Sequence, residues 1–356
     1  MTNISGTNNL LQIYAEAEHE KVVLWSDPES SYRGIIAIHS TVLGPAVGGT
    51  RIWNYASDEA ATFDALRLSR AMSYKNALAG LPFGGGKAVI LGNESTTDRE
   101  RMFRAHGRFV DSLGGRFITA EDVGTSPEDM EYIRMETPYV AGLASGAGDP
   151  SPMTGYGVFR ALEAAAKHRW GTLELTNRTI AIQGCGKTGY ELAKRLHQAG
   201  AKLLVSDIDA GRVRKLVHDF GATAVAPDQI LGVPADMLAP CALGGVINDE
   251  TIPQLKVEVI VGSANNQLLE DRHGEALHEI GILYAPDYVA NAGGVIHGCR
   301  ELLGWTQEQT EQRVHRIYDT LINIFESADS ETPPFKVANQ FAERKLFSTT
   351  HQPQIL

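Results

Sequence analysis

The segment TIAIQGCGKTG, residues 179–189, carries the clearest structural signal in this chain. Its first five residues are apolar and rich in β-branched side chains, a composition that predicts a buried strand. The apolar positions of residues 190–199 recur with helical spacing. Between strand and helix lies the pattern GxGxxG. A strand, a glycine loop and a helix in this order are typical of the first βα unit of a dinucleotide-binding fold.

Each glycine of the pattern has a predicted function. Gly184 allows a sharp turn, Gly186 lets a pyrophosphate approach the backbone, and Gly189 lets the helix pack closely against the strand. The N–H groups at the start of the helix attract phosphate. The other predicted cofactor-contacting residues of this loop are Cys185, Lys187 and Thr188. The alternative is an ordinary glycine turn between a strand and a helix.

An acidic residue follows at the spacing that such a site requires. Asp207 ends the next strand-like segment, eighteen residues after Gly189. A carboxylate there accepts hydrogen bonds from the ribose hydroxyls of NAD and repels the 2′-phosphate of NADP. Arg212 and Arg214 lie just beyond, where they would tolerate that phosphate or simply remain solvated. A phosphate loop of the GxxxxGK[ST] type is excluded because Ala181 stands where its first glycine belongs.

The overall composition narrows the class of protein. The chain has 356 residues, enough for two domains at roughly 150 residues each, and a formal charge of −11. Nucleic acid is an improbable partner, since affinity for it depends on basic residues. Three scattered cysteines form no disulfide framework, and we find no metal-binding or serine-nucleophile motif. Neither a secretory signal nor a membrane-spanning run is present in the sequence, so we expect a cytoplasmic protein.

Alternating segments predict an α/β fold. Further strands are expected at residues 202–205 and 257–261, which with 179–183 form a parallel sheet covered by helices on both faces. In the first 140 residues we expect strands at 35–40 and 87–91 and helices at 59–79 and 99–112. A last helix is expected at 335–347. Two segments rich in glycine, proline or small polar residues, 141–152 and 326–334, are predicted linkers.

The most unusual segment is Met72–Leu91, MSYKNALAGLPFGGGKAVIL. Lys75 and Lys87 are almost its only charges, and three glycines before Lys87 permit close backbone packing. Either both amines reach solvent at the end of apolar stems, or they are buried. A buried lysine beside another cation has a lowered pKa and is able to act as a general base.

Two other segments accompany these lysines. Residues 117–125, FITAEDVGT, place Glu121 and Asp122 at the end of an apolar run, where they either cap a turn or supply the counter-charge for the lysines. Residues 44–50, GPAVGGT, are predicted to form a glycine-rich turn whose backbone approaches a ligand closely.

Together these segments resemble the glutamate/leucine/phenylalanine/valine dehydrogenases, specifically the leucine and phenylalanine branch. The similar blocks, in order, are LGPAVGGTRIW (43–53), YKNALAGLPFGGGKAVI (74–90), FITAEDVGT (117–125), DPSPMTGYGVF (149–159), GCGKTG (184–189), GSANNQL (262–268) and PDYVANAGGVI (286–296). The resemblance implies two domains separated by a cleft. Residues 1–145 with 331–356 would form an α/β domain for substrate binding and oligomerisation, and residues 146–330 a Rossmann-type NAD domain.

The resemblance also implies functions for individual residues. Lys87 would be the catalytic lysine and Asp122 its acid/base partner, while Lys75 would hold the substrate carboxylate with the backbone of Gly48 and Gly49. Thr154, Asn265 and Asn291 would lie near the nicotinamide, its ribose or the substrate. The reaction implied is the reversible, NAD-dependent oxidative deamination of an amino acid to a 2-oxo acid and ammonia. The expected assembly is a homo-oligomer, with a dimer favoured over an octamer.

The implied substrate pocket is apolar. Its walls by resemblance are Val47, Met72, Ala120, Val295 and Gly298, with no charge to receive an acidic side chain. Leucine-type members have Asn then Val after the NAGG block, whereas this chain has His297 and Gly298, which leaves space for a ring.

The chain also resembles the cyanobacterial tryptophan dehydrogenases, which form indole-3-pyruvate, so we expect an aromatic substrate, tryptophan first. The alternatives are a leucine, valine or phenylalanine dehydrogenase in which Gly298 only relieves backbone crowding, and a regulator that binds NAD without catalysis.

Overall fold

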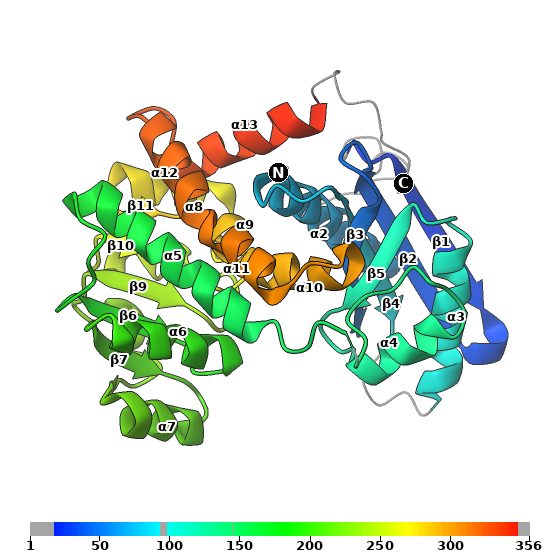
Figure 1. Cartoon of the computed structure of the whole chain (residues 1–356), viewed down its shortest axis with the longest axis horizontal. Coiled ribbons are helices and arrows are strands. Elements are labelled where there is room, and N and C mark those ends of the chain that lie inside the picture. The colour runs from blue at the N-terminus through cyan, green and yellow to red at the C-terminus, as the bar shows by residue number, and fades with distance from the viewer. Residues whose placement is uncertain (1–17, 93–97, 145, 348–356) are drawn as a thin grey trace. The chain divides into compact units, whose positions relative to one another are not determined.

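The computed structural model describes residues 18–92, 98–144 and 146–347. Most of the N-terminal segment in which we expect no secretory signal lies outside these residues. The contacts of the chain divide it into two compact units, 1–148 with 342–356, and 149–341 (Figure 1). The first division falls within the predicted linker 141–152, and the second lies inside helix α13 (Pro334–Phe347).

The first unit is built on a mixed five-stranded sheet. Its strands follow the order β1 (Lys21–Asp27), β2 (Tyr32–Ser40), β4 (Gly84–Leu91), β3 (Ala46–Trp53) and β5 (Phe117–Glu121). The β1–β2 and β2–β4 pairs are antiparallel, whereas β3 is parallel to both β4 and β5. Its helices are α2 (Asp58–Leu78), α3 (Arg99–Asp111) and α4 (Pro127–Arg134).

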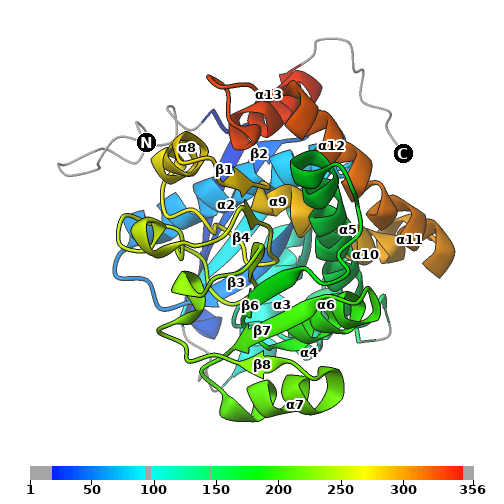
Figure 2. The same cartoon turned by 90° about the vertical axis from the view of Figure 1, so that its left-hand side faces the viewer.

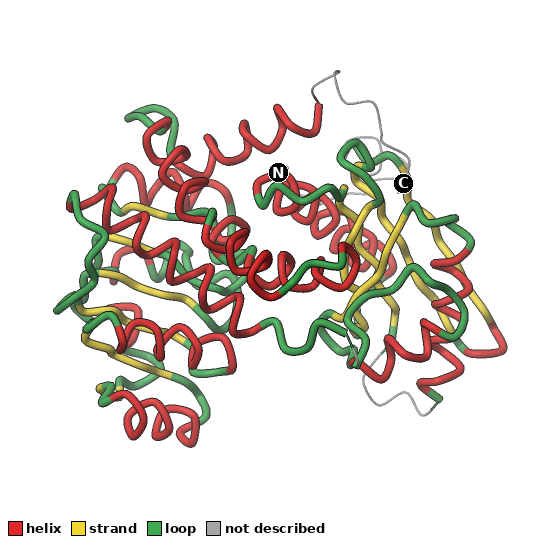
Figure 3. Tube along the Cα trace, viewed as in Figure 1, coloured by secondary structure: helices red, strands yellow, loops and turns green. Residues whose placement is uncertain are grey.

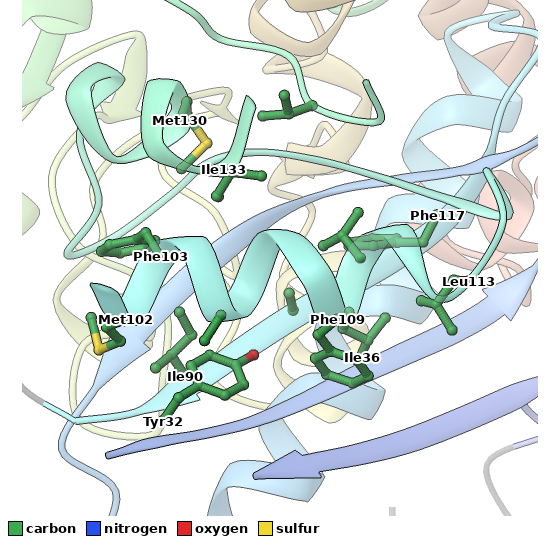
Figure 4. Packing of buried hydrophobic residues seen from close by; sticks show 14 of the residues in the cluster. Tyr32, Ile36, Ile90, Met102, Phe103, Phe109, Leu113, Phe117, Met130 and Ile133 are labelled. Atoms are coloured by element: carbon green, nitrogen blue, oxygen red, sulfur yellow. The ribbon is translucent and has the colours of Figure 1, made fainter. Parts of the chain in front are cut away.

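Two apolar clusters cover the two faces of this sheet. Helices α3 and α4 pack their buried side chains on one face, among them Phe103, Phe109 and Met130 (Figure 4). On the other face, Ala61, Ala65 and Leu66 of α2 pack against Ile35, Ala37 and Val89 of the sheet. Helix α2 therefore faces the odd-numbered positions of β4, which include Lys87.

Hydrogen-bonded polar side chains cross the apolar cluster under α3 and α4. His106 is fully buried; its Nδ1 lies 2.7 Å from the Tyr32 hydroxyl and its Nε2 lies 2.8 Å from Thr50 Oγ1. Burial disfavours the imidazolium and lowers the pKa of His106 to about 3. Between about pH 3 and pH 6.5 the ring is therefore neutral in the folded protein but protonated in the unfolded chain.

This histidine makes stability fall in mild acid. Because the folded-state pKa of His106 lies below the unfolded value, its contribution is complete above pH 6.5 and is lost as the pH falls toward 3. We expect His106 to lower the free energy of unfolding by about 1.4 kcal/mol per pH unit below 6.5. Urea titrations across this range measure it: His106→Asn should reduce the slope, and replacing the exposed His218 should not. An equal slope in both variants contradicts the prediction.

The second unit contains an all-parallel sheet (Figure 2). Its order is β11 (Leu283–Tyr284), β10 (Val259–Ile260), β9 (Met237–Pro240), β6 (Thr179–Gln183), β7 (Lys202–Ser206) and β8 (Thr223–Ala224). The helices of this unit, red in Figure 3, are α5 (Ser151–Trp170), α6 (Lys187–Gln198), α7 (Ala210–Phe220), α8 (Asp271–Glu279), α9 (Asp287–Ala290), α10 (Gly293–Leu303), α11 (Gln307–His315) and α12 (Ile317–Ser327).

The elements expected from the sequence are largely confirmed, with one correction. Strand 179–183 and the helices around 59–79, 99–112 and 335–347 are present, and the sheet of the second unit is parallel as predicted. The glycine-rich turn predicted at 44–50 is wrong beyond its first residues, because strand β3 begins at Ala46. Only Gly44, at φ 135°, has the conformation that favours glycine in a turn. None of the described helices is long and apolar enough to cross a membrane.

Candidate active site

Lys87 and Asp122 form an ion pair in the first unit. Lys87 lies in β4 and is 4% exposed, and Asp122 directly follows β5. The Lys87 Nζ lies 2.7 Å from Asp122 Oδ2. Strand β3 separates β4 from β5 in the sheet, so the lysine side chain spans a whole strand, about 4.8 Å on each side, to reach the carboxylate. Of the two explanations left open by the sequence, burial of this lysine is confirmed.

The glycines of β3 open the path between the two side chains. Thr50 pairs with Ala88 on one side and Glu121 on the other, which puts Gly49 level with Lys87. A Cβ at Gly49 would lie 2.7 Å from the Cβ of Asp122, and one at Gly48 would lie 1.8 Å from the Gly86 carbonyl oxygen. A side chain at either position would therefore displace the strand or the carboxylate. The predicted contact of this backbone with a substrate carboxylate stays a prediction.

Two further charged residues belong to the same cluster and were not singled out from the sequence. Arg51, on β3, donates from Nε to Asp122 Oδ2 over 3.0 Å and from Nη1 to Asp64 Oδ2 over 3.0 Å. Asp64 lies on α2, and its Oδ2 also accepts the Tyr55 hydroxyl at 2.6 Å. The available signal was an arginine in an otherwise uncharged strand segment, two residues after Gly49.

The electrostatics of the pair follow from burial and from these neighbours. Burial lowers the pKa of Lys87; Asp122 opposes that shift, and the positive charge of Arg51 adds to it. Burial alone would raise the pKa of Asp122, but Lys87 and Arg51 outweigh it and lower the pKa to about 2. Arg51, which was not singled out from the sequence, is thus a cation that lowers the pKa of Lys87, and the prediction that Lys75 lies beside Lys87 stays a prediction.

Lys75 lies near the end of α2, where that helix packs on β4. The Asn76 side chain donates to the Gly84 carbonyl over 2.6 Å. A Cβ at Gly85 would lie 2.0 Å from the Ser73 nitrogen, so the helix approaches the strand as closely as glycine allows. The close packing predicted from the three glycines is confirmed. Lys75 itself is half-buried, on the helix adjacent to the strand that carries Lys87.

The predicted pocket-wall residues of this unit lie on the same elements. Val47 is buried on β3, Ala120 is half-buried on β5, and Met72 is half-buried on α2. Ala120 pairs with Gly49 in the sheet. Val47 thus shares β3 with Arg51, and Met72 shares α2 with Lys75. Ala120 lies on β5, which ends just before Asp122.

The glycine loop lies in the second unit, between β6 and α6. Gly184 has φ 102°, and a Cβ at Gly189 would lie 2.0 Å from the Gly184 carbonyl oxygen, so both positions require glycine. At Gly186 the nearest atom to a Cβ would be Arg212 Nη1, 3.9 Å away. Helix α6 begins at Lys187 with no side chain capping its first N–H groups. This open backbone and uncapped helix start fit a dinucleotide pyrophosphate.

Asp207 lies against this loop, immediately after β7. Its Oδ2 accepts the Cys185 N–H over 2.7 Å, and its Oδ1 accepts the Asp209 N–H over 2.8 Å. Arg212 lies 4.0 Å from the same carboxylate and is otherwise exposed. The loop and the acidic residue predicted to bind one cofactor are therefore in direct contact.

The remaining predicted residues of this unit gather around the start of α10. Asn291 Nδ2 donates to Asn265 Oδ1 over 2.8 Å and to the Ser263 carbonyl over 3.1 Å. A Cβ at Gly294 would lie 2.7 Å from Thr154 Oγ1. Asn291 is 5% exposed, and its Oδ1 has no hydrogen-bond partner among the described residues. A buried acceptor without a partner fits a ligand that donates a hydrogen bond there.

Val295 and Gly298 lie on α10 and are half-buried. A Cβ at Gly298 would meet no atom within 4 Å. Neighbouring elements of the described structure therefore do not crowd this position, and the alternative substrates stay open.

Family models match nearly the whole chain. The model described as "Glu/Leu/Phe/Val dehydrogenase, dimerisation domain" matches residues 19–139. The model described as "Glutamate/Leucine/Phenylalanine/Valine dehydrogenase" matches residues 146–214 and 205–352. The chain belongs to the Glu/Leu/Phe/Val dehydrogenase family. The resemblance inferred from the seven sequence blocks is confirmed, and this dehydrogenase is an oxidoreductase that acts on amino acids with NAD as cofactor.

Relatives that are named for different substrates are about half identical in sequence to this chain. Leucine dehydrogenase from Bacillus cereus is 51% identical over 346 residues, covering 96% of this chain and 94% of that enzyme. L-tryptophan dehydrogenase from Nostoc punctiforme is 47% identical over 324 residues, covering 90% and 91%. The crystal structure of L-tryptophan dehydrogenase from Nostoc punctiforme matches with a TM-score of 0.85 at 44% identity, over 96% of this chain and 99% of that one. The two-domain fold of the family is thereby established for the dehydrogenase.

Proposed function

We propose that the dehydrogenase oxidises an aromatic L-amino acid, L-tryptophan in preference to others. The reaction is L-tryptophan + NAD⁺ + H₂O → indole-3-pyruvate + NH₄⁺ + NADH + H⁺. The observation that carries this proposal is the open space at Gly298, where a Cβ would meet nothing within 4 Å. A glycine inside a helix costs about 1 kcal/mol relative to alanine. Since no neighbouring atom requires glycine here, we infer that the position lacks a side chain in order to leave space for a bulky ligand.

Lys75 is proposed to bind the substrate carboxylate. Its position on α2, beside the backbone of β4, leaves the side chain half-buried, and a half-buried ammonium binds a carboxylate more strongly than one in bulk water. Val47, Met72 and Ala120 then supply apolar surface for the side chain and exclude a charged one.

Asp122 and Lys87 are proposed to move the protons. Bound NAD⁺ supplies the acceptor for the hydride that leaves Cα. Asp122 uses Oδ1 to take a proton from the substrate amine, since both of its cationic neighbours contact Oδ2. Burial lowers the pKa of Lys87 and so favours its neutral form, which deprotonates the water that attacks the oxidised carbon. Asp122 then returns its proton to the amine, which leaves as ammonia; the proton of the new hydroxyl passes to Asp122, and the 2-oxo acid remains.

A leucine or other branched-chain substrate is the second candidate, and it is supported by the relative from Bacillus cereus at 51% identity. Phenylalanine is a third. All three share an apolar side chain, so the wall residues alone do not separate them. The proposed assembly is a homo-oligomer, at least a dimer, as the description of the matched first domain suggests.

Filling the space at Gly298 is expected to change the choice of substrate. In Gly298→Val, kcat/KM for L-tryptophan should fall about tenfold or more relative to that for L-leucine, because added carbons in a pocket reject the larger side chain. Formation of NADH from a panel of L-amino acids measures both values. Gly298→Ala is the graded control: it should raise Tm, since alanine favours the helix, and reduce tryptophan oxidation less.

Two outcomes would count against this proposal. Equal losses for tryptophan and leucine in Gly298→Val would remove Gly298 from the pocket. A wild-type enzyme that oxidises L-leucine much faster than either aromatic amino acid would establish the second candidate instead.

A further inference from the structure

Asp122 has an asymmetric set of partners. Lys87 Nζ and Arg51 Nε both contact its Oδ2, at 2.7 and 3.0 Å, and no described residue contacts Oδ1. Its backbone N–H is held by Thr125 Oγ1 at 2.8 Å. The two cations therefore fix the carboxylate through one oxygen and leave the other for a ligand.

Arg51 is itself held at a second point. Its Nη1 contacts Asp64 Oδ2, and Asp64 is fixed in turn by the Tyr55 hydroxyl at 2.6 Å and by Arg67 Nη2 at 3.1 Å. The Arg51 and Asp64 side chains are only 22% and 15% exposed. A guanidinium that joins two carboxylates from different nitrogens has one orientation, which a lysine amine at the same place cannot reproduce.

We propose that Arg51, anchored by Asp64 and Tyr55, is a positioning residue for the proton-transfer pair: it holds Asp122 by Oδ2 and places its charge beside Lys87. This inference rests on the proposed functions of Lys87 and Asp122. Without Arg51, the carboxylate would turn about the single remaining contact with Lys87. Either carboxylate oxygen of Asp122 would then contact the Lys87 amine, and no single oxygen would be held toward the substrate.

The charge of Arg51 also bears on the lysine. Arg51 lowers the pKa of Lys87 in addition to burial, whereas Asp122 and Asp64 raise it. The charged and titratable side chains that face Arg51 are Asp122 after β5, Lys87 on β4, Asp64 and Arg67 on α2, and Tyr55. Loss of the guanidinium therefore raises the pKa of Lys87, so that the neutral base forms only at higher pH.

The test is the pH profile of kcat for amino-acid oxidation by the intact enzyme. Arg51→Met should lower kcat roughly 10–100-fold at neutral pH, with KM changed far less, because the pair is misplaced. The ascending limb of the kcat–pH profile of this variant should move to higher pH by about one unit, since a cation beside Lys87 has been removed. Arg51→Lys keeps the charge without the second contact, so the limb should stay in place while kcat is only partly recovered.

Arg67→Met is the matched control. It removes an equal charge from the same cluster without a contact to Asp122, and its limb should coincide with that of the wild type. An unshifted limb in Arg51→Met, with kcat reduced as in Arg67→Met, overturns the proposal.

If Arg51→Met does not fold, Asp64→Asn tests the same geometry. It removes the anchor of Arg51 without removing the guanidinium, so kcat should fall as in Arg51→Lys with KM changed far less, and an unchanged kcat overturns the proposal. Lys87→Ala distinguishes failure of the proposed function of Lys87 from failure of the positioning proposal for Arg51. If that variant stays active, the proposed function of Lys87 fails; if it is inactive and the Arg51 limb is unshifted, only the positioning proposal fails.

Discussion

Lys87→Ala is expected to abolish amino-acid oxidation while leaving NAD⁺ binding intact. The variant removes the amine whose pKa burial lowers, and with it the group that is proposed to deprotonate water. A loss of at least a thousandfold in kcat corresponds to about 4 kcal/mol of activation free energy. The glycine loop and Asp207 belong to the other unit of the chain and are unchanged. Steady-state NADH formation and calorimetric titration with NAD⁺ measure the two properties.

Lys345→Ala provides a matched control for this variant. Lys345 is another lysine of the first unit; it is exposed, and its Nζ donates to the Ala77 carbonyl at 2.9 Å and not to Asp122. Its replacement should alter stability without comparable loss of kcat. Oxidation by Lys87→Ala at more than a thousandth of the wild-type rate would show that this lysine is not the catalytic base.

Asp122→Asn is expected to have the second-largest effect. The amide keeps the shape of the side chain but accepts no proton, so kcat should fall about 10²–10⁴-fold, the range of a general acid–base group. The variant also leaves Lys87 and Arg51 without their shared counter-charge. Removing one member of a buried ion pair costs about 3–5 kcal/mol, an upper value here since the Asp122 side chain is 25% exposed.

The neighbouring carboxylate serves as the control for this prediction. Glu121→Gln changes the adjacent carboxylate, which is exposed. Its kcat should remain close to the wild-type value. If the two variants lose activity equally, net charge at this end of β5 matters and the specific geometry of Asp122 does not.

The dinucleotide site was predictable because its signal is local. The strand, the three glycines and the start of α6 are consecutive in the chain, and the backbone requires glycine at Gly184 and Gly189. Asp207 follows at the spacing set by one helix and one strand. Even so, the contact between its carboxylate and the Cys185 N–H could not be derived from spacing alone.

The lysine–aspartate cluster was predictable only in part, because it depends on strand order. Lys87 and Asp122 were identified from an uncharged surrounding sequence and from family resemblance, but their contact requires β3 to lie between β4 and β5. No local pattern encodes that order. For the same reason Gly48 and Gly49 were interpreted as a turn, and Arg51 was not recognised as the partner of both Asp122 and Asp64.

Gly298 and Gly49 differ in how much variation each tolerates. A side chain at Gly49 would collide with Asp122, so directed evolution has no freedom at that position. Gly298 lies on a helix of the other unit, where an added Cβ would meet no atom within 4 Å. If Gly298 lines the substrate pocket as proposed, a mutant library at this one codon would sample new substrate preferences without changing Lys87 or Asp122.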